Sequence, residues 1–235
     1  MKVGITLPQF RDEADTALAA ARRAEALGID GVFVFDHLWP MGQPGRPALS
    51  SGPLLGALAA STSTIHLGTL VARIGLLPDE VLLDVLCGVD ALSGGRLVAG
   101  IGTGDRLSRE ENEAYGIPYE HAQIRRERLE SVATAVAGTG IPVWVGGGRP
   151  EMVSVARAAG AAVNVWQVGA DAVAPLVAQG VEVTWGGPAG DTRAEVTATL
   201  ADVAAAGATW AVCAWPESIE VVAEAARTVA GQDRR

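Results

Sequence analysis

Short apolar runs alternate with segments of helical periodicity along the whole chain. The apolar runs are rich in β-branched and aromatic residues and are bounded by glycines or polar residues, which predicts strands. Their composition is apolar nearly throughout, as expected for a parallel sheet that is covered on both faces. The predicted strands are Val3–Leu7, Gly31–Phe35, Ile65–Arg73, Arg96–Gly100, Pro142–Val145, Ala162–Trp166, Val181–Trp185 and Thr209–Trp215.

The segments between these strands repeat apolar residues at helical spacing. Gly28 directly follows the first of them, where a helix commonly ends in a left-handed residue. The predicted helices are Asp12–Leu27, Pro53–Ser61, Asp79–Leu92, His121–Ala137, Pro150–Ala159, Ala170–Gln179, Thr192–Ala206 and Glu217–Ala230.

Eight consecutive strand–helix units predict an α/β fold, a single (β/α)₈ TIM barrel, which typically takes about 250 residues. A doubly wound open sheet also alternates strands and helices and is the alternative. No linker or low-complexity tract divides the chain, so one domain over residues 1–235 is expected. The chain leaves about 29 residues for each unit, near the lower practical size. We therefore expect a compact barrel with few insertions and an open, shallow substrate mouth.

Charge and composition exclude several classes of protein. The chain has 27 acidic and 18 basic residues, a net charge of −9, and 49% hydrophobic residues, which is typical of a globular protein and not of a nucleic-acid binder. No apolar run is long enough to span a membrane, and the first residues lack the features of a signal peptide. Cys87 and Cys213 match no metal or redox spacing, so buried thiols in a reducing cytoplasm are expected. Lys2 is the chain's only lysine, which excludes a Walker lysine and Schiff-base catalysis elsewhere in the chain.

Catalytic and binding residues are expected where strands end and helices begin, because TIM-barrel active sites lie at that face. Asp36 and His37 follow the second predicted strand, and a histidine there is suited to proton transfer near neutral pH. A structural histidine at the barrel rim that bonds Asp36 is equally compatible with the sequence. His66 begins a strand and His121 begins a helix, so the three histidines are too scattered to predict a metal site.

Glycines gather at the ends of three predicted strands. Gly68 and Thr69 lie in the third strand, where a glycine permits a bulge or the close approach of a ligand. After the fourth strand, glycines that admit a flat ring alternate with polar residues, namely Gly100, Gly102, Thr103, Gly104 and Asp105. After the fifth, the turn Gly146, Gly147, Gly148, Arg149 leads into a helix that begins with Pro150. Such a turn presents free N–H groups to an anion, which predicts a phosphate cradle.

Tryptophans occupy the predicted ends of strands six, seven and eight, at Trp166, Trp185 and Trp215. Together with Trp39 they predict an aromatic wall around a substrate pocket. Packing at the top of the barrel is the alternative explanation, because large rings fit there as well.

Taken together, these motifs resemble the bacterial luciferase-like family of flavin and deazaflavin oxidoreductases. The resemblance is carried by GITLPQF, the AE–LGIDGVFVFDH block, IHLGTLV, LSGGRLVAGIGTGD and PVWVGGGRPEMVSVARAAGAAVNVW. It extends in register over about the first 166 residues and continues loosely to the end. LSGGR with a G-x-G-x-G strand end and P-x-W-x-GG-x-x-P are fairly specific in combination.

The resemblance implies a TIM barrel that binds FMN or coenzyme F420, a 5-deazaflavin. The ring would lie near Gly68–Val71, often against a non-proline cis peptide in this family, and the glycine turn at 146–148 would hold the phosphate. The implied cofactor-binding residues are Asp36, Gly68, Thr69, Leu70, Gly102, Thr103, Gly104, Gly146, Gly147, Gly148 and Arg149. In the F420-dependent sugar-phosphate dehydrogenase branch, the positions of His37 and Asp105 serve as base and acid. The acid is typically glutamate there, so the shorter Asp105 departs from the pattern.

The resemblance favours an F420-dependent oxidoreductase that exchanges a hydride with a small organic substrate. Alternatives are an FMN-dependent monooxygenase, a non-catalytic flavin-binding barrel and a phosphosugar enzyme without a cofactor. Partners other than the substrate are limited to a second copy of the chain, since family members often form homodimers; no nucleic acid, membrane or metal is expected.

Overall fold

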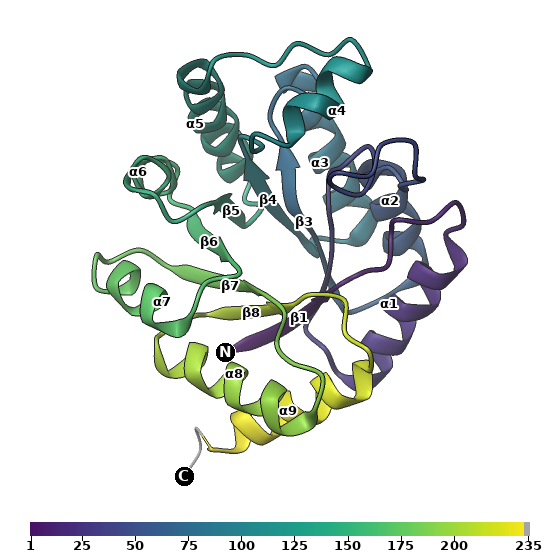
Figure 1. Cartoon of the computed structure of the whole chain (residues 1–235), viewed down its shortest axis with the longest axis vertical. Helices are drawn as coiled ribbons and strands as arrows, with labels where there is room; N and C mark the ends of the chain where they lie inside the picture. Colours follow the sequence, from purple (N-terminus) through teal and green to yellow (C-terminus); the bar gives the residue numbers. More distant parts are fainter. Residues whose placement is uncertain (233–235) are drawn as a thin grey trace.

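The computed structural model describes residues 1–232, and these form a closed barrel of parallel strands with helices on the outside (Figure 1). Each strand pairs with the next one in the chain, and the last pairs with the first. The TIM-barrel prediction is therefore confirmed. The strands are β1 (Lys2–Thr6), β2 (Gly31–Val34), β3 (His66–Arg73), β4 (Leu97–Gly102), β5 (Val143–Gly146), β6 (Ala162–Trp166), β7 (Val183–Gly187) and β8 (Trp210–Cys213).

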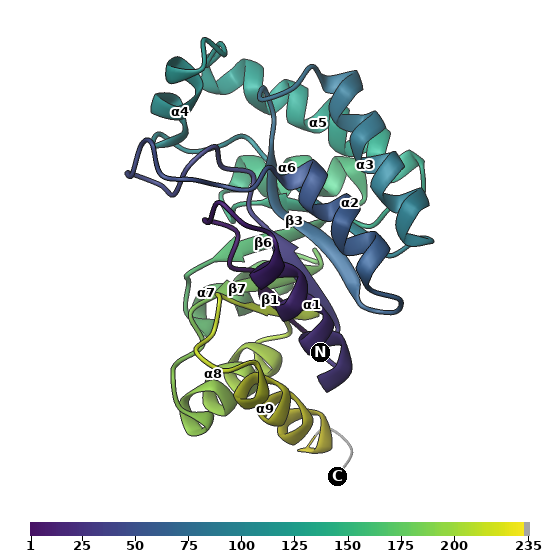
Figure 2. The same cartoon turned by 90° about the vertical axis from the view of Figure 1, so that its right-hand side faces the viewer.

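Helices connect each strand to the next and cover the outside of the barrel. Figure 2 shows that α4 and the loop between β2 and α2 project from the same side of the barrel. The helices are α1 (Asp15–Leu27), α2 (Ser51–Ser61), α3 (Asp79–Ser93), α4 (Ser108–Ala114), α5 (Ala122–Gly138), α6 (Pro150–Ala159), α7 (Ala170–Val177), α8 (Arg193–Ala205) and α9 (Ile219–Gln232).

Three aromatic side chains fill the interior of the barrel. Phe33 stacks on Trp144, with ring centroids 5.0 Å apart, and Trp210 meets both rings edge-on. Glycines on the neighbouring strands make room for them, since a Cβ on Gly4 would lie 2.7 Å from the Phe33 ring. Large aromatic rings thus occupy the interior that branched side chains fill in most barrels of this kind.

Lys2 and His66 lie beside Trp210 at the face where the strands begin. Lys2 Nζ lies 5.1 Å from the centroid of the Trp210 ring and 3.4 Å from His66 Nε2. Burial and the charge of Lys2 both lower the pKa of His66. His66, which was expected to begin a strand, is the first residue of β3 and therefore lies at the end of the barrel opposite the mouth.

Several predicted bounds differ from the structure by one to three residues, and two differences affect the site. The segment after β4 was expected to be a loop, but it contains α4, a polar helix with few apolar positions to reveal it. The seventh strand was expected at Val181–Trp185 and lies two residues later, at Val183–Gly187. As a result Trp185 is in the middle of β7 and not at its end.

Glu25 on α1 joins the helix to the turn that precedes β3. Its carboxylate accepts hydrogen bonds from the backbone N–H groups of Ser63, Thr64 and Ile65. Partial burial opposes ionisation, but these hydrogen bonds outweigh it and lower the pKa of Glu25 to about 2.

We expect Glu25→Gln to destabilise the protein at pH 7 by about 1 kcal/mol, because an amide accepts these bonds more weakly. Because the pKa of Glu25 is lower in the folded protein than its unfolded value of 4.5, the ionised carboxylate stabilises the folded state above pH 4.5. This stabilisation is lost as the pH falls to about 2. Urea denaturation of both proteins between pH 7 and pH 2 measures the effect. If the difference in the free energy of unfolding between the two proteins stayed constant over this pH range, the stabilising role of the ionised Glu25 would be contradicted.

Candidate active site

A histidine and a buried carboxylate meet at the end of β2. His37 Nδ1 lies 2.7 Å from Glu111 Oε1, and the His37 side chain is 16% exposed while that of Glu111 is 1% exposed. The other carboxylate oxygen of Glu111 accepts a hydrogen bond from the backbone N–H of Leu38. Because an ionised carboxylate can only accept, Nδ1 carries the hydrogen, and Nε2 is the basic nitrogen of the neutral ring.

Arg73, at the end of β3, holds this pair in place. Its guanidinium donates from Nη2 to Glu111 Oε2 at 2.7 Å and from Nε to the carbonyl of Asp36 at 2.7 Å. The carboxylate of Asp36 accepts from the backbone N–H of Arg73 and from the hydroxyl of Ser51. Asp36 therefore braces the ends of β2 and β3, and both its carboxylate oxygens have protein donors.

The charge state of Glu111 follows from these contacts. Burial alone would raise its pKa, but the hydrogen bonds from His37 and the Leu38 N–H, with the charges of His37 and Arg73, lower the pKa below its usual range. A buried carboxylate is stable only with such partners. Glu111 is consequently a fixed negative charge that orients the imidazole.

A bulge in β3 shapes the opposite part of the barrel mouth. The register between β3 and β4 shifts between Thr69 and Ala72, and the Leu70–Val71 peptide bond is cis, within the stretch where the sequence predicted one. The half-buried side chain of Val71 points toward glycines on the next two strands. A Cβ on Gly102 would lie 2.6 Å from Val71, and one on Gly146 would lie 3.3 Å from it.

These glycines make a low floor in the mouth on the side of β3, β4 and β5. They leave room for Val71, so any flat ligand here would rest on Val71 and not on bare glycine backbone. Gly68 and Thr69 lie deeper: Gly68 packs against Phe33, and the buried hydroxyl of Thr69 donates to the carbonyl of Gly100. Leu70 is buried as well.

The glycine turn after β5 leads directly into α6. Gly147 has a φ of 108°, a backbone conformation that side chains disfavour, and Pro150 occupies the first turn of the helix. Arg149 is the N-cap residue, and no side chain caps the helix. Pro150 has no N–H, and the N–H groups of Met152 and Val153 donate to the Arg149 carbonyl. The exposed Arg149 guanidinium, at the positive end of the α6 dipole, is therefore the main group here that is suited to an anion.

The predicted acid Asp105 is not the partner of His37 in the structure. It is exposed, and its carboxylate accepts hydrogen bonds from the N–H and hydroxyl of Ser108, at the start of α4. Glu111, six residues further on, makes the contact with His37. Glu111 could not be singled out from the sequence, because the short polar helix that carries it has no apolar periodicity.

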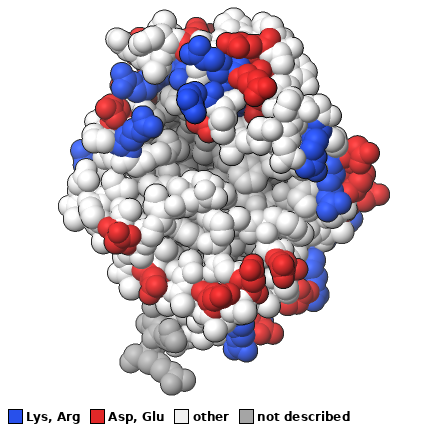
Figure 3. Space-filling view, viewed as in Figure 1, with Lys and Arg blue, Asp and Glu red and all other residues white. Residues whose placement is uncertain are grey.

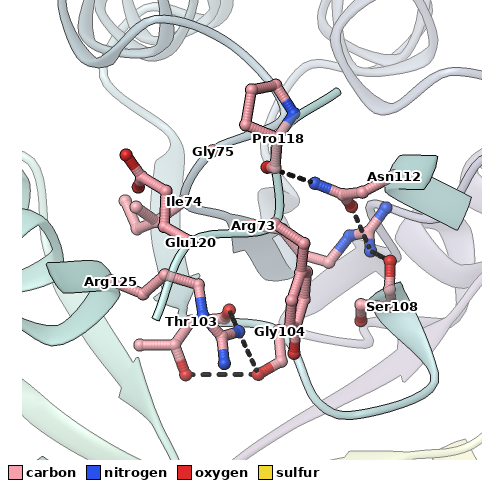
Figure 4. A pocket seen from close by; sticks show the side chains of 11 residues that line it. Arg73, Ile74, Gly75, Thr103, Gly104, Ser108, Asn112, Pro118, Glu120 and Arg125 are labelled. Atoms are coloured by element: carbon pink, nitrogen blue, oxygen red, sulfur yellow. Dashed lines mark hydrogen bonds between the residues drawn. The ribbon is translucent and has the colours of Figure 1, made fainter. Parts of the chain in front are cut away.

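Thr103 and Gly104 form the loop between β4 and α4. Their carbonyls accept hydrogen bonds from Arg125 Nη1 of α5, and the Thr103 hydroxyl donates to the Gly104 carbonyl. Figure 4 shows these groups beside Arg73, around a cavity of about 10 Å³. That volume accommodates about one water molecule, so this cavity is too small for a cofactor or an organic substrate.

The predicted tryptophan wall is only partly present. Trp166 ends β6, is half-buried and joins the aromatic cluster inside the barrel. Trp185 faces the helices instead, because side chains alternate along β7 and those of its two neighbours face inward. Its indole N–H donates to the carbonyl of Val168. Trp39 is 5% exposed beside Tyr115, and Trp215 is 42% exposed beyond the end of β8. The assignment of Trp185 to the mouth was therefore wrong.

The fold and the site together define a class of protein: a TIM barrel with a histidine–carboxylate pair and a glycine floor at the mouth. Among residues 1–232, no three His, Cys, Asp or Glu side chains are grouped so as to hold a metal ion. In the same residues, no helix is both long and apolar enough to cross a membrane.

The sequence model of the luciferase-like monooxygenase family matches residues 1–133, more than half of the chain. The chain belongs to this family. The matched region includes β1 to β4 and both members of the His37–Glu111 pair.

Curated proteins of similar sequence include F420-dependent glucose-6-phosphate dehydrogenases. The protein from Microbacterium testaceum is 34% identical over 118 residues, which are 48% of this chain and 33% of the relative. The protein from Beutenbergia cavernae is 34% identical over 131 residues, which are 55% of this chain and 37% of the relative. The matches thus span about a third of the length of these relatives.

Solved structures share the fold over nearly the whole chain. An F420-dependent secondary alcohol dehydrogenase in complex with an F420–acetone adduct superposes with a TM-score of 0.82 at 12% identity, covering 97% of this chain and 98% of that one. The F420-dependent tetrahydromethanopterin reductase from Methanopyrus kandleri gives a TM-score of 0.73 at 15% identity and covers 95% and 98%. At these identities the likeness concerns the fold.

Proposed function

We propose that the protein is an F420-dependent oxidoreductase that transfers a hydride between the deazaflavin and a small organic substrate. The observation that carries the proposal is the His37–Glu111 pair at the edge of the glycine floor. The curated relatives and two structural neighbours named above are F420-dependent proteins, which favours the deazaflavin over FMN.

The residues at the mouth fit a flat cofactor with a phosphate. The floor at Gly102 and Gly146 carries no side chains of its own, and Val71 presents an apolar surface above it. The uncapped start of α6, with Gly147, Gly148 and Arg149, would hold the phosphate. Gly102, Thr103 and Gly104 would border the ring.

The chain's own contribution to the reaction is proton transfer and orientation. When bound, the deazaflavin supplies one ring carbon, C5, that accepts or gives a hydride. His37 takes the hydroxyl proton when an alcohol is oxidised and returns a proton when a carbonyl is reduced. Glu111 stabilises the imidazolium that forms, in the way a buried carboxylate supports a catalytic histidine in other enzymes. Asp105 is the second candidate acid, near the same loop.

Cofactor binding tests the proposal directly. We expect F420 to bind to the purified protein at least about tenfold more tightly than FMN, as measured by quenching of cofactor fluorescence. Tight binding of FMN without binding of F420 would contradict the proposal and favour an FMN-dependent monooxygenase.

Two arginines of α6 provide a matched pair of variants for the phosphate site. Arg149→Gln should weaken cofactor binding by about tenfold, since it removes a charged donor beside the proposed phosphate. Arg157→Gln removes an exposed arginine from the last turn of the same helix, where it donates to the carbonyl of Gln179, and should leave the affinity unchanged. Equal effects of both variants would contradict the assignment of the phosphate site.

A further inference from the structure

Three aromatic rings form a continuous row at the mouth, beside the glycine floor. Phe10 stacks on Phe35 with centroids 5.9 Å apart, and Phe35 meets Trp166 edge-on at 5.8 Å. All three side chains are half-buried. They come from the ends of β1, β2 and β6, and we refer to them as the aromatic row.

The backbone around Trp166 is shaped to hold its ring in this position. Gly186 on β7 leaves the necessary space, because a Cβ there would lie 2.5 Å from the indole. Directly after Trp166 the chain turns through Gln167, which has a φ of 56°, and the Gln167 N–H donates to the carbonyl of Gly186. A positive φ is unfavourable for glutamine, so the turn that ends β6 beside the indole is fixed by the surrounding fold.

Phe35 is fixed by a buried side chain on the other side of the row. The amide of Gln9, which is fully buried, donates to the carbonyl of Phe35 at 2.8 Å and accepts from its backbone N–H. Gln9 also donates to the carbonyl of Leu49 in the loop after β2. The backbone of Phe35 and the turn after Trp166 are thus positioned by the protein's own contacts, which reduces the entropy lost on binding.

The charged side chains next to the row, those of Asp36, Arg73 and Glu111, are already paired with other groups of the protein. Figure 3 shows a hollow at the centre of the face, with uncharged atoms on its visible wall and a group of basic side chains beyond its upper rim. Arg109 and Arg125 belong to the elements on that rim, where both lie against the ring of Tyr119. A strongly charged substrate would therefore lose its hydration against the row without gaining an ionic partner from it.

We infer that the aromatic row is the substrate wall, and that the substrate is a small apolar alcohol or carbonyl compound, with aromatic ones preferred over sugar phosphates. The inference rests on the proposed function. His37 follows Phe35 by two residues, so the row and the proton-transfer group lie next to each other. A ring packed on Trp166 and Phe35 gains both apolar burial and edge-to-face contact.

The reaction on such a substrate balances as follows. A secondary alcohol loses the hydrogen of its carbinol carbon as a hydride, with two electrons, to oxidised F420, and it loses its hydroxyl proton to His37. The alcohol becomes a ketone and F420 is reduced, so no further oxidant is required. The reverse reaction reduces a ketone with reduced F420 and a proton from His37.

Acetophenone and 1-phenylethanol are the probes, with glucose 6-phosphate as the charged comparison. We expect acetophenone to bind the protein with a Kd at least about tenfold below that of glucose 6-phosphate, measured by saturation-transfer NMR with and without F420. With F420 present, 1-phenylethanol should give a kcat/KM at least about tenfold above that of glucose 6-phosphate. A preference for glucose 6-phosphate in both measurements would overturn the inference.

Substitutions of Trp166 locate the binding site. Trp166→Ala should raise the Kd for acetophenone about tenfold, and Trp166→Phe should restore most of the affinity because it keeps an aromatic face. Trp185→Phe changes a tryptophan on the adjacent strand that faces the helices and should have no effect. An unchanged Kd in Trp166→Ala would overturn the inference.

The outcomes separate this inference from the proposed function. If F420 binds but acetophenone does not, the substrate class is wrong and the proposed function stands. If F420 fails to bind, the proposed function is wrong, and the NMR measurement without cofactor still decides whether the aromatic row binds an apolar ligand.

Discussion

Alanine in place of His37 is expected to lower turnover by about 10²–10⁴-fold, the usual contribution of a positioned general acid or base. The imidazole is the proton-transfer group of the proposed reaction, and alanine leaves no group that replaces it. Cofactor affinity should change little, because the floor and the α6 turn remain intact. Steady-state kinetics with 1-phenylethanol, together with fluorescence titration of F420, measure the two quantities separately.

His121→Ala is the matched control for this prediction. His121 is an exposed histidine at the start of α5, where its ring accepts a hydrogen bond from the Gln123 N–H, so its loss should leave turnover unchanged. Glu111→Gln keeps a hydrogen-bond acceptor near His37 but removes the charge, and we expect a lower kcat because the imidazolium that forms during the reaction is no longer stabilised by a carboxylate. If His37→Ala retained full turnover, the protein would fit a non-catalytic cofactor-binding barrel.

The second large effect concerns stability, and it is expected for Arg73→Met. This change leaves the buried carboxylate of Glu111 without its arginine partner and removes the bond to the Asp36 carbonyl. Breaking a buried ion pair by removing one partner costs about 3–5 kcal/mol. Chemical denaturation followed by circular dichroism measures the free energy of unfolding.

Two comparisons make this prediction specific. Arg128→Met also removes ion pairs, to Asp79 and Glu120, but the Arg128 side chain is 25% exposed, so we expect a loss of only about 1 kcal/mol. The double variant Arg73→Met, Glu111→Gln removes both charges and should recover part of the stability lost in the single variant. Equal losses for Arg73→Met and Arg128→Met would show that burial does not determine the cost.

Much of the fold could be predicted because local signals and the global arrangement agree. The bounds of α6 and β6 match the prediction, since Pro150 begins the helix and Gly160 ends it with a left-handed residue. The shift of β7, in contrast, has a cause that is not local. Gly186 and Gly187 carry no side chain that would favour a strand, and they belong to β7 only through pairing with β6 and β8.

The candidate site was harder to predict, because it depends on contacts between distant parts of the chain. His37 stood out as a rare residue at a strand end, whereas Glu111 is one of several acidic residues in a polar segment. The two residues are 74 positions apart in the sequence, and only the folded barrel brings them into contact. Trp185 shows the same limit. Whether its side chain faces the helices or the inside of the barrel depends on how β7 pairs with its neighbouring strands.

The position of Lys2 has a practical consequence for experiments on this protein. It is the chain's only lysine, and it lies at the face where the strands begin, against Trp210. Coupling of a fluorophore or a sensor surface to its side-chain amine would therefore attach the molecule by the end of the barrel where the strands begin. Every immobilised copy would present its mouth to the solution, so that cofactor and substrate titrations could be carried out on an oriented layer.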